Sequence, residues 1–190
     1  MRAIPVLSLV LLAALPAAAA RADRQMDPEL RGVIAGAITP ADCFEDKYEQ
    51  AVWLAYMDPR LGRYVKDAGE REQILHNVHC EAKRAEIPPE LVLAVMDVES
   101  RFNRYAVSSA GAVGLMQVMP FWPKELGMSN SQLVRVSDNI RMGTTILSYY
   151  LRKERGNYQR ALQRYNGSLG RPNYSDLVLD RLISRWRYAY

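Results

Sequence analysis

Apolar residues recur at three- and four-residue intervals through most of the chain after residue 38. This spacing places apolar side chains on one face of an α-helix. The expected helices are marked by these positions: Phe44, Tyr48, Val52 and Ala55; Ile74, Leu75, Val78 and Ala82; the run 91–99; Ile140, Gly143, Thr144, Leu147, Tyr150 and Leu151; Ala161, Leu162 and Tyr165; Leu179, Leu182, Ile183 and Trp186. No run of alternating apolar and polar residues indicates a strand, so the predicted fold class is all-α.

Helix-start signals support these positions. Thr39-Pro40, Asp67 followed by Glu70, Pro88-Pro89 and Asn157 each precede an expected helix. The length suits one domain over residues 39–190. Residues 23–38 lack strong periodicity, and we expect them to form a mobile N-terminal arm.

Glu99 ends the most apolar of these helical runs and continues the stripe of Val92, Val95 and Met96. Burial disfavours the charged form of a carboxyl group and raises its pKa, which suits a general acid. The alternative is a glutamate that turns out to solvent where the helix ends. Asp97, two residues earlier, is expected on another face of the helix, in contact with solvent or a basic partner.

The loop after Glu99 contains Gly111, Gly114 and Gln117, the last flanked by Met116 and Met119. The glycines would allow a positive φ or a close approach of backbone to a ligand, and the glutamine offers both donors and acceptors. The pattern fits a ligand groove and, equally, a helix connection with a core glutamine.

Three ordered blocks resemble one family. Between Glu99 and Pro120 stand Glu-Ser, Phe-Asn, Ala, Ser and Gly-Ala-Val-Gly-Leu-Met-Gln-Val-Met-Pro; Asn139-Ile-Arg-Met-Gly143 and Arg164-Tyr-Asn-Gly167 follow. Together they resemble the soluble lytic murein transglycosylases, whose domain is related in fold to goose-type lysozyme. The resemblance covers roughly residues 87–186 and implies a lysozyme-like domain. One departure is Arg164, where the family usually has alanine.

The resemblance implies a role for each matching residue. Glu99 would be the only catalytic acid and base, and Tyr165 would hydrogen-bond near it and position it. Ser108, Gln117, Met119 and Asn166 would line a glycan groove, with Ser100, Gly114 and Met116 as secondary contacts. Each groove residue also has a structural alternative: Ser108 in a turn, Met119 as core filler, Tyr165 as a core aromatic and Asn166 as a helix cap.

The implied reaction cleaves the β-1,4 bond between N-acetylmuramic acid and N-acetylglucosamine in peptidoglycan and leaves a 1,6-anhydro end. It needs no cofactor, no metal and no second carboxylate. Two alternatives stay open. One is a muramidase that admits water, with Asp138 as its candidate acidic partner. The other is a murein-binding scaffold of an envelope or secretion machine, whose proteins would be partners beside the glycan strands.

The N-terminus resembles an export signal. Met1-Arg2, an apolar run from Ala3 to Leu15 and small residues near Ala20 predict a signal peptide over residues 1–22. An uncleaved membrane anchor is the alternative, but the apolar run is short for a span. We expect a periplasmic or secreted protein without stable membrane insertion after cleavage.

Cys43 and Cys80 are the only cysteines, and an even count in an exported protein favours a disulfide. The alternative is a zinc site in which both cysteines join His76 and His79. The formal net charge of +4 suits an anionic cell wall. The excess is too small to indicate nucleic acid as a partner, because proteins that bind nucleic acid usually show a concentrated basic stripe.

Overall fold

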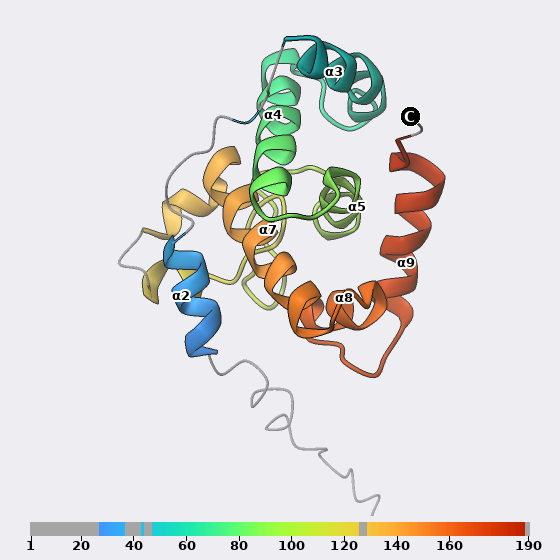
Figure 1. Cartoon of the computed structure of the whole chain (residues 1–190). Helices are drawn as coiled ribbons and strands as arrows, with labels where there is room; N and C mark the ends of the chain where they lie inside the picture. Colours follow the sequence, from blue (N-terminus) through green and yellow to red (C-terminus); the bar gives the residue numbers. More distant parts are fainter. Residues whose placement is uncertain (1–26, 37–42, 44–46, 126–128, 189–190) are drawn as a thin grey trace, which may run out of the picture.

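The computed structural model describes residues 27–36, 43, 47–125 and 129–188, and the described part is helical (Figure 1). Its elements are α2 (Pro28–Gly36), α3 (Lys47–Leu61), α4 (Ala68–Arg84), α5 (Pro89–Glu99), α6 (Phe121–Glu125), η1 (Asn130–Val134), α7 (Val136–Lys153), α8 (Tyr158–Asn166), α9 (Asn173–Arg181) and η2 (Leu182–Trp186). Within these ranges the only β-type pairing is two isolated bridges, Val107 with Val113 and Val113 with Val118. The predicted all-α class is confirmed.

Helix α5 lies at the centre of the core. Every residue from Leu91 to Asp97 is buried, so the helix needs neighbours on all sides. It contacts α4, α9 and η2, and Figure 1 shows it enclosed between α4 and the C-terminal helices. Helix α7 packs against α2, α4 and α8 and forms the other long wall of the core. Glu99 therefore ends a helix that the whole domain holds in place.

The predicted helix starts are confirmed where they are described. Asp67 Oδ1 accepts a hydrogen bond of 2.7 Å from the Glu70 amide, and Asn157 Oδ1 accepts one of 3.0 Å from the Arg160 amide. Pro89 occupies the first turn of α5. Residues 39–42 and 44–46, with the expected Thr39-Pro40 start and Phe44, lie outside the described residues.

The predicted inward face of α3 is wrong. Tyr48 and Val52 are 83% and 55% exposed, whereas Trp53, Met57 and Leu61 are buried. Both groups of residues have helical spacing, so periodicity alone does not show which of the two helix faces is buried. The Trp53 face turns inward because it fills more volume and because its indole N–H finds an acceptor there, the Leu75 carbonyl at 3.0 Å.

Part of the expected mobile arm is a docked helix. Pro28–Gly36 forms α2, which packs on α7 and buries Leu30 and Ile34. Two buried positions in a nine-residue helix are too few to give a periodic signal in sequence. The signal-peptide prediction for residues 1–22 lies outside the described residues. None of the helices that the structure describes is long and apolar enough to cross a membrane.

Cys43 and Cys80 form a disulfide, with Cα atoms 4.9 Å apart, so the predicted pairing is confirmed. The two sulfurs are bonded to each other and are therefore not thiolate ligands for zinc. Both histidines of the alternative set lie beside them: Cys80 Sγ is 3.6 Å from His76 Nε2, and Cys43 Sγ is 3.9 Å from His79 Nδ1. His79 also packs against Trp53 at 5.3 Å between ring centroids, and its Nε2 lies 3.4 Å from Glu49.

Candidate active site

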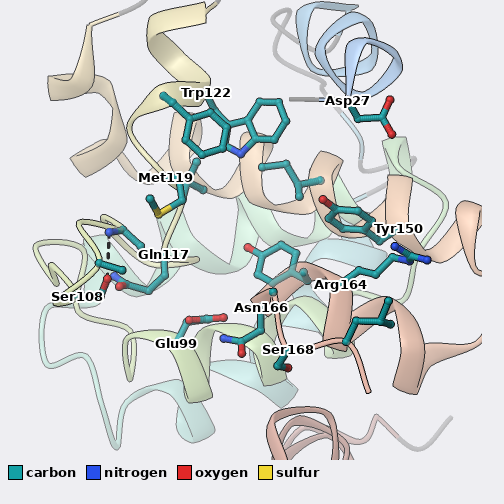
Figure 2. Close-up of a pocket in the computed structure, with 18 of the residues that line it drawn as sticks. Asp27, Glu99, Ser108, Gln117, Met119, Trp122, Tyr150, Arg164, Asn166 and Ser168 are labelled. Carbon is teal, nitrogen blue, oxygen red and sulfur yellow. Dashed lines mark hydrogen bonds between the residues drawn. The ribbon is translucent and has the colours of Figure 1, made fainter. Parts of the chain in front are cut away.

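One cavity of about 690 Å³ gathers the candidate catalytic residue and all the primary groove residues that the sequence assigned to the glycan (Figure 2). The predicted residues among its lining are Glu99, Ser108, Gln117, Met119, Tyr165 and Asn166. They come from the end of α5, the following loop and the end of α8, which are distant in sequence. In Figure 2, Ser108 and Gln117 lie on one side of Glu99, and Asp27, Tyr150 and Arg164 on the other.

The Glu99 carboxyl group is mostly buried at the cavity wall, and burial raises its pKa from the ordinary 4.5 to about 7. Tyr174 acts against this shift because its hydroxyl donates a hydrogen bond of 2.6 Å to Glu99 Oε1. A carboxyl group with this pKa holds its proton in a large fraction of molecules at neutral pH. It can therefore donate that proton and, once charged, accept another.

Asp97 faces away from this cavity, as expected from its position on α5. It is only 5% exposed and accepts hydrogen bonds from Tyr64 Oη at 3.2 Å and Trp186 Nε1 at 3.1 Å. Arg185 Nη1 adds a third at 3.3 Å. Of the two expected environments, solvent or a basic partner, the structure shows the basic partner. Asp97 ties η2 to α5.

The predicted hydrogen-bonding role of Tyr165 is not what the structure shows. Its hydroxyl donates to the Met116 carbonyl at 2.7 Å, and the hydroxyl on Glu99 belongs to Tyr174. The pKa of each tyrosine is raised well above its ordinary value, mainly by burial and also by the nearby Glu99. Tyr165 thus lines the cavity and anchors the loop, while Tyr174 holds the Glu99 carboxyl group.

Sequence reasoning missed two residues. Tyr174 lies in the first turn of α9, just after Pro172. A proline at this position is a helix-start signal, and it would have placed the start of the helix before the expected apolar positions that begin at Leu179. Ser168 lines the cavity, and its buried hydroxyl has no hydrogen-bond partner among the described residues. A buried hydroxyl without a partner is costly, so one that faces a cavity points to a ligand group.

The secondary residues shape the loop rather than the cavity lining. Gly114 has φ +83°, and a Cβ there would lie 2.3 Å from Asn139 Nδ2. Asn139 Oδ1 accepts from the Met116 amide at 2.8 Å, and Nδ2 donates to the Val113 and Leu133 carbonyls at 2.9 and 2.8 Å. Ser100 Oγ donates to the Leu115 carbonyl at 2.7 Å. Gly114, Met116 and Ser100 are absent from the lining, so their expected glycan contacts are not seen.

Two predicted groove residues are fixed by the loop backbone. Gln117 Nε2 donates to the carbonyls of Ala106 and Gly114 at 3.2 and 2.9 Å, in a residue with φ +50°. Ser108 Oγ accepts from the Ala112 amide at 3.0 Å. Ser108 therefore forms the turn that was expected as an alternative and also lines the cavity. Both side chains are preorganised before any ligand arrives.

Charged groups gather at the side of the cavity near α2. Asp27 accepts hydrogen bonds from Tyr149 Oη and from Lys153 Nζ, the latter at 2.7 Å. The bond from Lys153, then that from Tyr149, lowers the pKa of Asp27 to about 2. Arg164, the departure from the family pattern, is bonded to Glu154 and also lines the cavity. This side of the cavity is therefore polar and charged.

Asp138, the candidate second acid for a water-using reaction, is not in the lining. Its carboxylate oxygens lie 3.8 Å from Arg135 Nη1 and 3.9 Å from Arg141 Nη1. Among the described residues that line the cavity, the only carboxylate besides Glu99 is Asp27.

Comparison with known proteins finds similar chains. Membrane-bound lytic murein transglycosylase C of Actinobacillus pleuropneumoniae serotype 5b (strain L20) is 58% identical over 48 residues, which are 25% of this chain and 13% of that protein. Its namesake in Yersinia enterocolitica serotype O:8 is 35% identical over 105 residues, 47% of this chain and 29% of the relative. A crystal structure of lytic transglycosylase Slt from Pseudomonas aeruginosa has 26% identity and a TM-score of 0.47, covering 85% of this chain and 28% of that one.

The chain thus spans less than a third of the length of each of these proteins. A family model described as the transglycosylase SLT domain matches residues 76–175, more than half of the chain, and includes Glu99, the loop after it and α8. The chain belongs to the transglycosylase SLT domain family.

Proposed function

We propose that the protein is a lytic transglycosylase that cleaves the β-1,4 bond between N-acetylmuramic acid and N-acetylglucosamine in peptidoglycan. The observation that carries this proposal is Glu99, a mostly buried carboxyl group with a pKa near 7 at the wall of a cavity. The only other carboxylate in the described lining, Asp27, already accepts hydrogen bonds from Tyr149 and Lys153. A reaction that uses one carboxyl group fits this lining better than the two-carboxylate scheme of most glycosidases.

The reaction starts with the proton of Glu99. The carboxyl group donates it to the glycosidic oxygen while the bond to C1 of the muramic sugar breaks through an oxocarbenium-like state. The Glu99 carboxylate then takes the proton of the C6 hydroxyl of the same sugar, and the C6 oxygen bonds to C1. The product is a 1,6-anhydro end; Glu99 regains its proton, and no water is consumed.

Tyr174 positions the acid, because its hydroxyl holds Glu99 Oε1 at 2.6 Å. Ser108, Gln117, Met119 and Asn166 form the glycan-facing wall, and Tyr165 lines the same cavity. The Ser168 hydroxyl supplies a further donor or acceptor for a sugar hydroxyl. Such fixed side chains select the substrate without taking part in proton transfer.

The proposed substrate indicates the compartment in which the protein acts. Peptidoglycan lies outside the cytoplasmic membrane, which agrees with the signal peptide expected at residues 1–22 and with the disulfide between Cys43 and Cys80. We propose that residues 39–190 are the catalytic domain of a periplasmic or secreted enzyme. Proteins of an envelope or secretion machine are its candidate partners.

The test is the mass of the products. Purified peptidoglycan is digested with the wild type and with Glu99→Gln, and the soluble fragments are analysed by mass spectrometry. We expect fragments with 1,6-anhydro ends from the wild type and none from Glu99→Gln, which keeps the shape of the side chain but removes its proton. Fragments heavier by one water would show a muramidase instead. Activity of Glu99→Gln within tenfold of wild type would refute the assignment of Glu99.

A further inference from the structure

A second cavity, of about 620 Å³, lies between the end of α3 and η2. Its lining includes Arg60, Arg63 and Arg185 together with Tyr64 and Trp186. All of these lie outside residues 76–175, the part that the family model matches. Figure 1 shows how the fold brings these flanking segments together: α3 and the C-terminal end of the chain lie on the same side of the molecule, and α3 contacts η2.

Two of the three guanidinium groups are held in place. Arg185 Nη1 donates to Tyr64 Oη and to Asp97 Oδ2. The Arg60 guanidinium stacks over the Tyr56 ring at 3.8 Å and donates to the Tyr56 carbonyl. The stacking leaves Arg60 charged and oriented, because a ring face does not neutralise a cation.

Arg63 is the unpaired cation of the cavity. It is exposed, and its guanidinium has neither an ion pair nor a hydrogen bond within the described parts of the chain. The nearby carboxylates are committed elsewhere: Asp97 is buried under Tyr64, Trp186 and Arg185, and Asp58 is bonded to Arg71 at 2.6 Å. The cavity therefore has more positive than negative charge.

This arrangement suits a carboxylate on a flexible chain. A guanidinium group presents paired N–H donors that match the two oxygens of a carboxylate. The partly exposed Tyr64 ring adds an aromatic wall for the apolar part of a ligand, and the buried Trp186 lies beneath the cavity. The cavity volume falls in the range of small-molecule sites. A recessed pocket of this kind fits a discrete side group better than it fits the flat surface of a bilayer.

We propose that this second cavity binds the free carboxylates of the peptide stems of peptidoglycan. The inference rests on the proposed function, because that substrate supplies both glycan and peptide. The two cavities are on different faces of α5: Glu99 faces the first, while Asp97 holds Arg185 and Trp186 of the second. A glycan strand in the first cavity thus leaves the second one free for a stem peptide of the wall around it.

The test measures binding without cleavage. In a Glu99→Gln background, co-sedimentation with intact sacculi is compared for Arg63→Glu and for Arg135→Glu. Arg135 is a matched control because its side chain is 65% exposed and it lines neither cavity. We expect Arg63→Glu to weaken binding about fivefold or more, and Arg135→Glu by less than about twofold. Arg63→Ala, a smaller change, should weaken binding in the same direction, and circular dichroism checks that each variant is folded.

Binding to two further materials, peptide-free glycan and lipid vesicles, shows which ligand the cavity takes. On glycan strands stripped of their peptides by an amidase, Arg63→Glu should bind as well as Arg135→Glu. A loss that persists on stripped glycan, or an Arg63→Glu affinity for sacculi equal to that of the control, overturns the proposal. If Arg63→Glu binds more weakly than the control only to vesicles of phosphatidylglycerol and phosphatidylcholine, the cavity binds a membrane surface, and the proposal is also overturned. If the wild type forms no 1,6-anhydro products, the proposed function is refuted. Failure of the proposed function is therefore seen in the products, and failure of the second-cavity proposal is seen in binding.

Discussion

The catalytic role proposed for Glu99 depends on where α5 ends. Residues 91–97 of the helix are buried, and the carboxyl group of Glu99 stays largely inside the domain but faces a cavity. Burial raises its pKa, and the Tyr174 hydroxyl lowers it in part. The two effects set the pKa near 7, where one group serves both as acid and as base.

The raised pKa makes a prediction about stability. The folded state binds the Glu99 proton more tightly than the unfolded chain, so this contribution is complete below pH 4.5 and is lost as the pH rises through about 7. Relative to Glu99→Gln, the free energy of unfolding of the wild type should fall by up to about 3 kcal/mol between pH 4.5 and pH 8. Urea titrations of both proteins across this range measure it. A difference that stays constant with pH would mean that the Glu99 pKa is not raised.

Tyr165 and Tyr174, both partly buried, give a matched pair of hydroxyl deletions. Tyr174→Phe removes the hydrogen bond that favours the Glu99 carboxylate, so the alkaline limb of the pH–rate profile should move to higher pH and kcat should fall roughly tenfold. Tyr165→Phe removes a bond to the Met116 carbonyl and should cost about 1–2 kcal/mol of stability with an unchanged limb. The opposite pattern would restore Tyr165 as the positioning residue.

At the level of elements, the helix starts that depend on local sequence signals could be predicted from the sequence. Caps at Asp67 and Asn157, the proline start of α5 and the apolar run before Glu99 all appear where they were expected. The inward face of α3 and the docking of α2 could not be predicted, because each depends on which surface a distant helix offers. Tyr174 was missed for the same reason, since its partner is 75 residues away in sequence.

The loop after Glu99 offers a test of close packing. Gly111 and Gly114 share a positive φ, +85° and +83°, but only Gly114 is enclosed. A Cβ at Gly114 would lie 2.3 Å from Asn139 Nδ2 and 2.4 Å from the Leu133 carbonyl oxygen, so Gly114→Ala should displace the loop and cost several kcal/mol. Gly111→Ala meets open space and should cost only about 1–2 kcal/mol of backbone strain. Thermal unfolding of the two variants compares them; equal losses would show that backbone strain alone matters.

For the whole molecule, the disulfide between Cys43 and Cys80 fastens the chain before α3 to α4. It closes a loop with a sequence separation of 37, which in the chain-entropy model stabilises the fold by about 4 kcal/mol. Replacing both cysteines with serine should lower the free energy of unfolding by up to that amount and leave the shape of the pH–rate profile unchanged. Urea unfolding with and without a reductant gives the comparison. A wild type insensitive to reductant would show that the bond contributes little.

The packing of the whole domain explains why the sequence located the candidate catalytic cavity but not its surroundings. The family blocks from Glu99 to Gly167 supplied the primary residues proposed to face the glycan, and the fold brings all of these into one lining. Asp27 and the residues that line the second cavity come from the flanking segments, where no motif indicated which residues would be their neighbours. Their position follows from helix packing across the whole domain.

The most direct test of the central claim, that one carboxyl group cleaves the glycan without water, is digestion of peptidoglycan in water labelled with a heavy oxygen isotope. The new ends should be 1,6-anhydro sugars without the label, and Glu99→Gln should produce none. Labelled reducing ends on the wild-type products would contradict the claim, because they would show that water, not the C6 hydroxyl, attacks C1.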